Sequence, residues 1–307
     1  MKKKIFLFGL ILLFCNIQIE AQVISIMKYE SEEGGNKLDT LQKEIIDQAK
    51  YRVYYSISFI NDTSRLSREE GQTILQIGSK YNAFLDYNVL RMDSIHDKLV
   101  SENIEIEELI PTMINFKKLI KFDPTIIKNY PERGKSIFQQ KVSSDMYRYT
   151  DNIKIEWQLQ EEEKEIEGYT CKKANCHYKG RNYIAWYAPE VPITEGPYVF
   201  SGLPGLIMEI GDTENHYRFL LNGLVAVDYY DPIYILTDKV VEVSRKEFRK
   251  MIHNIKTDPS SLLKSMGVSD GKGQSVSIKV NGSSSDMSMD EILAKMGKRP
   301  YNPIELE

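Results

Sequence analysis

The chain has 307 residues, of which 42% are hydrophobic and 27% are charged, a composition typical of a globular protein and unlike disordered or collagen-like chains. The net charge of −4 excludes the large basic surface that wholesale nucleic-acid binding requires. Three cysteines and four histidines leave little material for a zinc module. Nineteen tyrosines favour a protein rich in β-strands, because tyrosine suits half-buried pleated strands.

The N-terminus has the pattern of a secretory signal peptide. Three lysines precede an apolar run over Ile5–Phe14, which is much shorter than the roughly 20 residues that span a bilayer. We predict that residues 1–21 form the signal peptide, with cleavage after Ala21; an N-terminal anchor helix is the alternative. Phe14 directly before Cys15 argues against a lipoprotein signal. The mature chain is then expected to be secreted or periplasmic, without a transmembrane segment.

The next part of the chain predicts strands separated by polar connections. Val23–Tyr29 favours a strand and Leu38–Lys50 a short helix. Polar and apolar residues alternate over Arg52–Phe59, which is typical of a strand with one buried face. Gln72–Ile77 and Lys80–Leu85 then predict a pair of neighbouring strands.

The middle of the chain changes from a helical pattern to a strand pattern. Tyr87–Leu99 predicts a helix, and a stripe of apolar residues that we interpret as core packing follows at steps of three and four: Leu109, Met113, Phe116 and Ile120. Ile153–Gln160 alternates most cleanly and predicts a half-buried strand. The acidic stretch Gln160–Glu167 predicts a solvated hairpin loop, because it lacks the spaced oxygen ligands of a calcium loop.

The second half predicts hairpins followed by a helix. Asn222-Gly223 between two apolar runs is a strong hairpin signal, because both turn positions need a positive φ. Ser244 and Glu247 form a capping box for a helix that ends at Asp258-Pro259. The remaining strands are expected at Tyr169–Tyr178, Asn182–Ala188, Ile233–Leu236 and Val240–Val243.

A change in amino-acid composition divides the mature chain into a domain and a tail. We predict that residues 22–267 form a single β-rich domain. Residues 268–307 are rich in serine and glycine and contain two late prolines, so we expect a weakly ordered tail with an edge strand over Val276–Val280 and a short helix over Asp290–Met296.

The segment 167–212 carries the most specific pattern. Pro204 presets φ for the first central position of a turn, and Gly205 allows the positive φ that a type II turn needs at the second. A strand with alternating apolar residues begins directly after this turn. The whole hexapeptide consists of Gly202, Leu203, Pro204, Gly205, Leu206 and Ile207.

This segment resembles the signature of the GLPGLI family. The matching residues are the hexapeptide itself and Gly168-Tyr169, Cys171, Lys173-Ala174, Gly180-Arg181, Ala185-Trp186-Tyr187, Pro192 and Gly196-Pro197. The resemblance implies a secreted or periplasmic protein of a Gram-negative bacterium, and it implies no catalytic residues, because no activity is established for the family. The sequence departs from the signature at Cys176 and in the tail.

The two cysteines of the mature chain are expected to be free. Cys171 and Cys176 are five residues apart, so on one strand they point to opposite faces about 16 Å apart. A disulfide requires Cα atoms within about 7 Å. A tight turn between the two residues is the alternative that would permit a bridge.

Patterns for catalysis and for metal binding are weak. Cys171, Cys176 and His177 match no common zinc spacing, and we expect no metal and no cofactor. A thiol relay of Cys171 with His216 or His253 requires a proximity that the sequence does not reveal. No Gly-x-Ser-x-Gly elbow, phosphate loop or dinucleotide fingerprint is present.

The aromatic residues before the hexapeptide are the best candidates for a binding site. Trp186, Tyr187, Tyr198 and Phe200 lie among prolines, and either line a concave apolar surface or fill the core beneath the turn. We expect an α+β, mainly β fold: a curved antiparallel sheet, similar to half a barrel, with a few helices packed on one side.

The leading functional hypothesis is an exported, non-enzymatic accessory or binding protein of the cell envelope. Its partner is then an envelope protein or a small apolar or peptide ligand, and nucleic acid is not expected. The alternative is an envelope hydrolase that acts on peptide or glycan.

Overall fold

A computed structural model of the chain describes residues 21–22, 40–65, 67–104, 112, 115–142, 145–258, 275–280, 283–288, 298 and 300–307. The signal peptide, except its last residue, and the strand expected over Val23–Tyr29 lie outside these residues, as does the helix expected over Asp290–Met296. Among the described residues, no helix has both the length and the apolar character to cross a bilayer.

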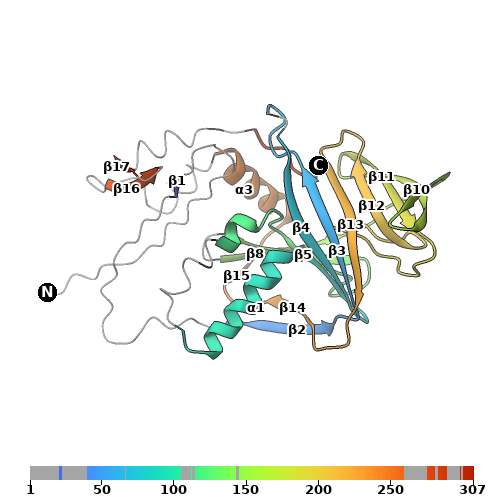
Figure 1. The fold of residues 1–307 in the computed structure, drawn as a ribbon, viewed down its shortest axis with the longest axis horizontal. Helices are drawn as coiled ribbons and strands as arrows, with labels where there is room; N and C mark the ends of the chain where they lie inside the picture. The colour runs from blue at the N-terminus through green and yellow to red at the C-terminus, as the bar shows by residue number, and fades with distance from the viewer. Residues whose placement is uncertain are drawn as a thin grey trace.

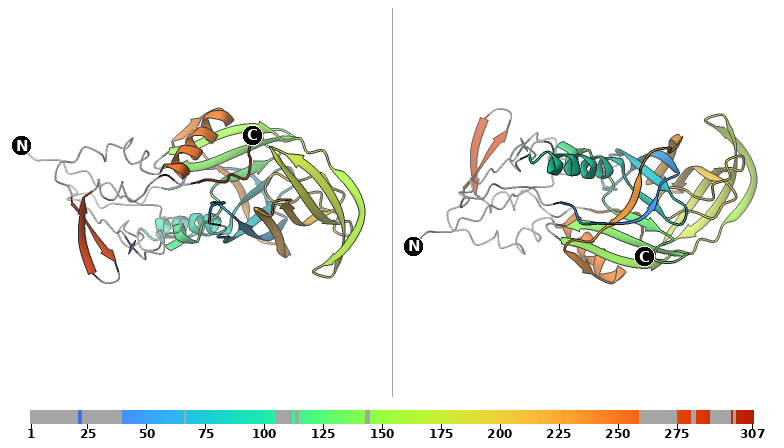
Figure 2. Two further views of the ribbon diagram at one scale, coloured as in Figure 1. Left: turned by 90° about the horizontal axis from the view of Figure 1, so that it is seen from above. Right: turned by 90° about the horizontal axis from the view of Figure 1, so that it is seen from below.

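Twelve strands form one continuous sheet, which curls along its length (Figures 1 and 2). All neighbouring strands in it are antiparallel except β15 and β8, which are parallel. The strands in sheet order are β15 (Val240–Glu242), β8 (Asp145–Asn152), β7 (Lys135–Val142), β6 (Thr125–Lys128), β5 (Asn82–Asp86), β4 (Glu69–Ile77), β3 (Tyr51–Phe59), β13 (Tyr217–Ala226), β12 (Leu206–Asp212), β11 (Arg181–Ala188), β10 (Tyr169–Tyr178) and β9 (Gln158–Ile166).

Two smaller sheets and a few helices, which include the helical residues 115–119, complete the described structure. β2 (Lys43–Gln48) pairs with β14 (Pro232–Leu236), whereas β16 (Ser275–Val280) pairs with β1 (Ala21–Gln22) and β17 (Ser283–Ser288). The two longer helices are α1 (Tyr87–Ser101) and α3 (Arg245–Thr257), and both lie to the left of β3, β4 and β13 in the view of Figure 1. The expected fold class, mainly β with a curved sheet and few helices, is therefore confirmed.

The two helices begin at residues that cap them. The side chain of Asp86 accepts a hydrogen bond from the backbone N–H of Asn88 at the start of α1. Ser244 and Glu247 form the expected capping box of α3, and Asp258 caps the other end. Asp86 and Ser244 accept from backbone N–H groups that the start of a helix leaves without a partner, whereas the N–H of Asp258 donates to the carbonyl of Asn254 at the end of α3.

The large sheet has an apolar core on each face. The inner face, defined here by Phe84, Phe138 and Phe219, carries the larger core and is covered by α3. The outer face carries a smaller core that includes Leu85 and receives Leu90 of α1. The strands alternate residues between these two cores because successive side chains of a strand point to opposite faces.

The two local predictions around β9 are wrong. Residues 153–157 keep the alternating burial of a strand but pair with no neighbour, and the acidic stretch expected to be a loop forms most of β9 instead. β9 is the edge of the sheet, so its polar side chains stay in water while the backbone pairs with β10. Cross-strand ion pairs support it, such as Lys173 with Glu162, whose charged atoms are 2.6 Å apart.

The hairpin expected at Asn222-Gly223 is also absent. β13 runs through these residues from Tyr217 to Ala226. The register against β3 shifts between Leu221 and Gly223, so the glycine marks a β-bulge. A bulge and a hairpin turn both favour glycine, and the local sequence does not distinguish them. The helix expected over Leu38–Lys50 is likewise wrong, since this part of the chain contains β2.

The end of the chain differs from the expected weakly ordered tail where it is described. Residues 300–307 pack against the sheet, and Asn302 and Glu305 are buried there. The backbone N–H of Asn302 donates to the carbonyl of Asn61 over 2.8 Å, and that of Leu306 donates to Lys179 over the same distance. Residues 276–280 form a strand as expected, but β16 lies between β1 and β17 and is therefore not an edge strand. We call residues 300–307 the strap.

Candidate functional site

The hexapeptide shapes a tight connection between β11 and β12. Gly205 has a φ of +149°, and a Cβ built on it would lie 2.2 Å from the carbonyl oxygen of Ala188. Its N–H donates to the carbonyl of Leu203, which makes a three-residue turn around Pro204 instead of the expected type II turn. The N–H of Leu206, which would close a type II turn, donates to Val191 instead.

A buried lysine holds the connection that precedes the hexapeptide. Lys128 at the end of β6 has a side chain that is only 4% exposed. Its Nζ lies 2.6 Å from a carboxylate oxygen of Glu195 and donates to the carbonyls of Gly196 and Phe200 over 3.1 and 3.0 Å. The connection is thereby fixed against the inner face of the sheet, because a buried ammonium group requires all of these partners.

The structure places three of the four aromatic candidates in the core. Tyr187, Tyr198 and Phe200 are buried in the inner core, and the ring centres of Tyr198 and Phe200 lie 5.9 Å apart. Trp186 is half-buried, and the Nζ of Lys164 lies 4.4 Å from the centre of its ring. Of the four, Tyr198 alone lines the cavity described next. The four residues therefore do not line one common site.

Tyr198 occupies an unusual position. Its φ is +55°, which is uncommon for a residue other than glycine and accumulates at functional sites. Its hydroxyl donates to Oε1 of Glu305 over 2.5 Å. Burial, together with the nearby Glu305, raises the pKa of the Tyr198 hydroxyl well above its ordinary value, so this group stays a hydrogen-bond donor.

A cavity of about 340 Å³ lies between the inner face, α3 and the strap. This size is at the low end of the range of about 300–1,000 Å³ that is typical of small-molecule sites. Aromatic and aliphatic side chains form most of its apolar lining: Ile57, Phe59, Phe122, Pro124, Phe138, Tyr149, Tyr198, Tyr217, Phe248, Ile252, Tyr301, Pro303 and Ile304. The polar and charged residues in the lining are Asn61, Lys121, Asp123, Gln140, Arg249, Lys250, His253, Lys256 and Glu305.

Long-range hydrogen bonds fix the strap as one wall of this cavity. The hydroxyl of Tyr217 donates to the carbonyl of Asn302 over 2.6 Å. Arg181 donates to the side-chain oxygen of Asn302 over 2.5 Å and to the carbonyl of Pro303 over 2.7 Å. Residues 303–305 then line the cavity directly.

The cysteines are free and buried, as expected, although the geometric reason differs. Cys171 and Cys176 both belong to the inner core in spite of their odd spacing, and the pairing of β10 with β9 shifts between them, at Lys172 and Ala174. Burial raises the pKa of Cys171 to about 11 and that of Cys176 to about 12. Thiols with such pKa values are poor nucleophiles at neutral pH.

The histidines do not complete a thiol relay. His253 lines the cavity from α3, and His216 lies in the turn before β13. The one hydrogen bond of the Cys171 thiol within the described residues goes to the carbonyl of Tyr169. The proximity that the relay requires is therefore not present in the described part of the chain.

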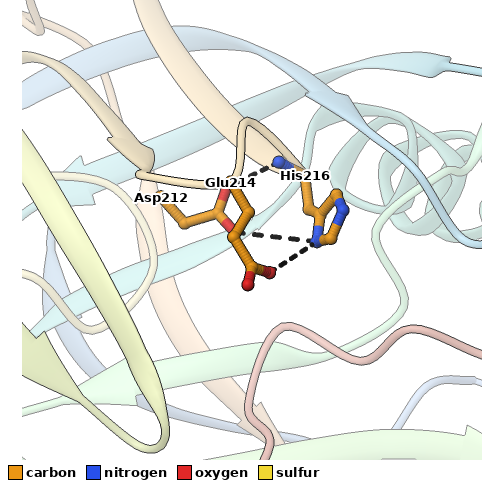
Figure 3. Close-up of side chains that lie close together, drawn as sticks. All are labelled: Asp212, Glu214 and His216. Atoms are coloured by element: carbon orange, nitrogen blue, oxygen red, sulfur yellow. Dashed lines mark hydrogen bonds and ion pairs between the residues drawn. The ribbon is translucent and has the colours of Figure 1, made fainter. Parts of the chain in front are cut away.

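A second polar cluster consists of Asp212, Glu214 and His216 (Figure 3). Nδ1 of His216 lies 3.1 Å from a carboxylate oxygen of Glu214 and 4.0 Å from one of Asp212. Asp212 is already fully engaged: one oxygen accepts from the backbone N–H groups of His216 and Tyr217, and the other accepts from Arg181 over 2.7 Å.

Arg181 lies among the three side chains of this cluster and argues against metal binding there. Its guanidinium also lies 3.2 Å from Nδ1 of His216 and 3.6 Å from Glu214, so a cation already occupies the space between the three side chains. A metal ion would have to displace a buried arginine that also holds the strap. The cluster therefore fits a structural role in joining the β12–β13 turn to the strap.

Sequence reasoning missed most of the cavity. Its residues come from β3, β7, β8, α3 and the strap, which are far apart in the sequence. The apolar face of α3 was the available signal, because Phe248 and Ile252 of that face do line the cavity. The strap offered no signal, since it is short and has no periodic pattern.

Residues 176–209, which include the hexapeptide, match a family model described as a protein of unknown function (Porph_ging). No curated protein is similar to the chain at a significant level. Two solved structures of PNGF-II, in space groups P21 and C2, are 14% and 15% identical, with TM-scores of 0.45 and 0.43. Each similarity covers 67% of this chain, which spans about a third of the PNGF-II chains, 33% and 32% respectively.

Proposed function

We propose that this chain is a binding protein that holds a small, largely apolar ligand in the cavity between the inner face, α3 and the strap. The observation that carries the proposal is the cavity itself, which has a ligand-sized volume and a mostly apolar lining. An interior otherwise packed to high density does not leave such a space without a structural reason.

The construction of the walls supports this role. Lys128 and the turn at Gly205 fix the connection that presents Tyr198, and the strap closes the other side. The wall residues are thus held by hydrogen bonds from outside the cavity. Such preorganisation lowers the entropic cost of binding, because few side chains have to be ordered by the ligand.

The site of action that we propose is the bacterial cell envelope. The support is the signal-peptide pattern of residues 1–21 and the resemblance of residues 202–207 to the GLPGLI signature. The proposal includes membership of that family and predicts cleavage after Ala21. N-terminal sequencing of the exported protein tests the cleavage site, and an N-terminus upstream of Ala21 would contradict it.

The binding proposal is tested with a neutral, apolar fluorescent naphthylamine probe and the chain from residue 22 onward. We expect saturable binding that Gln140→Trp weakens at least tenfold, because Gln140 lines the cavity from β7 and the larger side chain fills it. Lys141→Trp is the matched control, since the adjacent residue points to the other face and is exposed.

The two variants separate loss of binding from loss of folding. Both proteins are first compared by circular dichroism and thermal unfolding, and each is expected to keep a cooperative transition. Absence of probe binding to the unsubstituted protein, or equal binding by both variants, would overturn the proposed cavity function.

A further inference from the structure

The lining of the cavity has an excess of positive charge, although the chain as a whole has a net charge of −4. Four cations and two acids line it: Lys121, Arg249, Lys250, Lys256, Asp123 and Glu305. Three of the four cations come from α3. The local charge is thus opposite to the overall charge, and a group of cations at a low-dielectric cavity attracts anions.

Both acids in the lining are already paired. Oδ2 of Asp123 accepts from Nζ of Lys256 over 2.7 Å. Glu305 accepts from the hydroxyl of Tyr198 and from Arg245, each over 2.5 Å. Because Arg245 is not part of the lining, it neutralises Glu305 without using one of the four cations.

Three of the cations keep charge available for a ligand. Lys250 is exposed and has no ion-pair partner within the described residues. Nζ of Lys121 lies 3.8 Å from a carboxylate oxygen of Glu69, an ion pair longer than a hydrogen bond that compensates only part of the lysine charge. Arg249 donates to the backbone carbonyl of Glu305, an uncharged acceptor, and the charge of its guanidinium is therefore not compensated there.

The apolar part of the cavity restricts where an anion is able to lie. Phe122, Phe138 and Ile252 offer no donor to a charged group, and an anion buried among such side chains without partners is strongly disfavoured. A ligand that satisfies both parts has its charge at the cations and its apolar body against these side chains.

We propose that the ligand is a small amphiphile with a single apolar chain and an anionic head group. The chain lies in the apolar part of the cavity, and the head lies near Lys121, Arg249 and Lys250. This inference rests on the proposed binding function and adds the charge of the ligand to it. A carboxylate and a phosphate head share the required chemistry.

The test is displacement of the neutral naphthylamine probe by four ligands with the same alkyl chain: dodecanoate, dodecyl phosphate, dodecanol and dodecyltrimethylammonium. We expect the anionic ligands to compete at least tenfold better than dodecanol, and the cationic ligand to compete worst. Raising the salt concentration is expected to reduce the preference for anionic ligands, because Lys121, Arg249 and Lys250 are at least partly exposed to solvent. The ratio between the two anions distinguishes a carboxylate from a phosphate head.

A double variant links the preference to the named residues. Lys121→Gln with Lys250→Gln is expected to bring dodecanoate to within about twofold of dodecanol, with each competition measured relative to the probe affinity of the same variant. Lys246→Gln is the control, an exposed lysine of α3 that does not line the cavity. Equal competition by anionic, neutral and cationic ligands would refute the anionic head and leave the cavity function standing. Failure of the probe to bind at all would instead refute the cavity function.

Discussion

The most constrained single residue is Gly205. An added Cβ would lie 2.2 Å from the oxygen and 2.6 Å from the carbon of the Ala188 carbonyl, and both atoms belong to the rigid backbone of the sheet. We expect Gly205→Ala to lower the free energy of unfolding by about 3 kcal/mol, as overpacking and backbone strain act together. Urea unfolding of the chain from residue 22 onward measures the loss.

Gly168 provides the matched control for this substitution. It also has a positive φ, +79°, but nothing lies within 4 Å of an added Cβ. Gly168→Ala is therefore expected to cost only the backbone preference, about 1 kcal/mol. Equal losses in the two variants would mean that φ alone, and not the close approach to Ala188, makes Gly205 necessary.

The buried thiols give a prediction that depends on pH. Burial raises the pKa of Cys171 to about 11 and of Cys176 to about 12, so the reactive thiolate is scarce at pH 8 in the folded protein. We expect alkylation by iodoacetamide to be slow at pH 8 and to rise about tenfold for each pH unit up to pH 10. In urea at pH 8 both thiols are expected to react rapidly, since their pKa values return to about 8.5.

A rapid reaction of either thiol in the folded protein at pH 8 would contradict this environment. Failure of both thiols to react in urea, without a reductant, would show that they are bridged. The free state of these cysteines was predictable from the sequence, but their common inward direction was not. The pairing of β9 with β10 is irregular between the two cysteines, and this irregularity leaves no mark in the residue spacing.

At the scale of elements, the attachment of residues 195–200 to β6 depends on Lys128. Lys128→Met removes the partner of Glu195 and two carbonyl hydrogen bonds in a buried environment. We expect a loss of about 3–5 kcal/mol of unfolding free energy, typical of a buried ion pair that loses one partner. Thermal and urea unfolding measure it.

An exposed pair on the next strand is the control for Lys128. Nζ of Lys135 lies 2.6 Å from Glu132, the same distance as in the buried pair, but the two side chains are 40% and 64% exposed. Lys135→Met is expected to change stability by less than about 1 kcal/mol. The double variant Lys128→Met with Glu195→Met is expected to regain part of the loss, because it leaves no buried charge. A Lys128→Met protein as stable as the Lys135→Met protein would contradict the anchoring role.

Elements were predictable where the local pattern is unambiguous. β3, β4, β10 and α3 lie within two or three residues of the expected ranges, because strand alternation and a capping box are local signals. β9 and β13 were misread for a different reason. The sequence of an edge strand with acidic side chains resembles that of a loop, and the sequence of a bulge at Asn222-Gly223 resembles that of a hairpin turn. Only the pairing with the neighbouring strand distinguishes them.

At the scale of the whole molecule, the cavity exists because distant segments meet on the inner face. Tyr198 was predicted as a binding residue and does line the cavity, but the remaining walls include β3, β7, β8, β13, residues 121–124, α3 and the strap. Sequence periodicity identifies which face of α3 is apolar; it does not identify which strands that face covers. The composition of residues 268–307 led to the expectation of a weakly ordered tail, whereas the strap packs against the sheet.

The strap leads to the prediction that tests the architecture as a whole. The side chain of Asn302 accepts from Arg181 over 2.5 Å and donates to the carbonyl of Ile60 over 2.8 Å, which joins the chain end to β11 and to the residue after β3. Asn302→Ala removes one acceptor of the buried Arg181 guanidinium, which keeps Asp212 and the carbonyl of Pro303, and it removes the side-chain donor to the carbonyl of Ile60. We expect it to lower the free energy of unfolding by about 2–4 kcal/mol, because unsatisfied buried polar groups keep their desolvation penalty.

The strap also contains its own control. Leu306 lies four residues further along and is 48% exposed, so Leu306→Ala is expected to change stability by less than about 1 kcal/mol. A weakly ordered chain end would make both substitutions neutral, whereas a packed strap separates them. Because residues 303–305 line the cavity, Asn302→Ala is also expected to weaken binding of the naphthylamine probe under conditions where the protein stays folded. A stable Asn302→Ala protein with unchanged probe affinity would show that the strap is not a wall of the site.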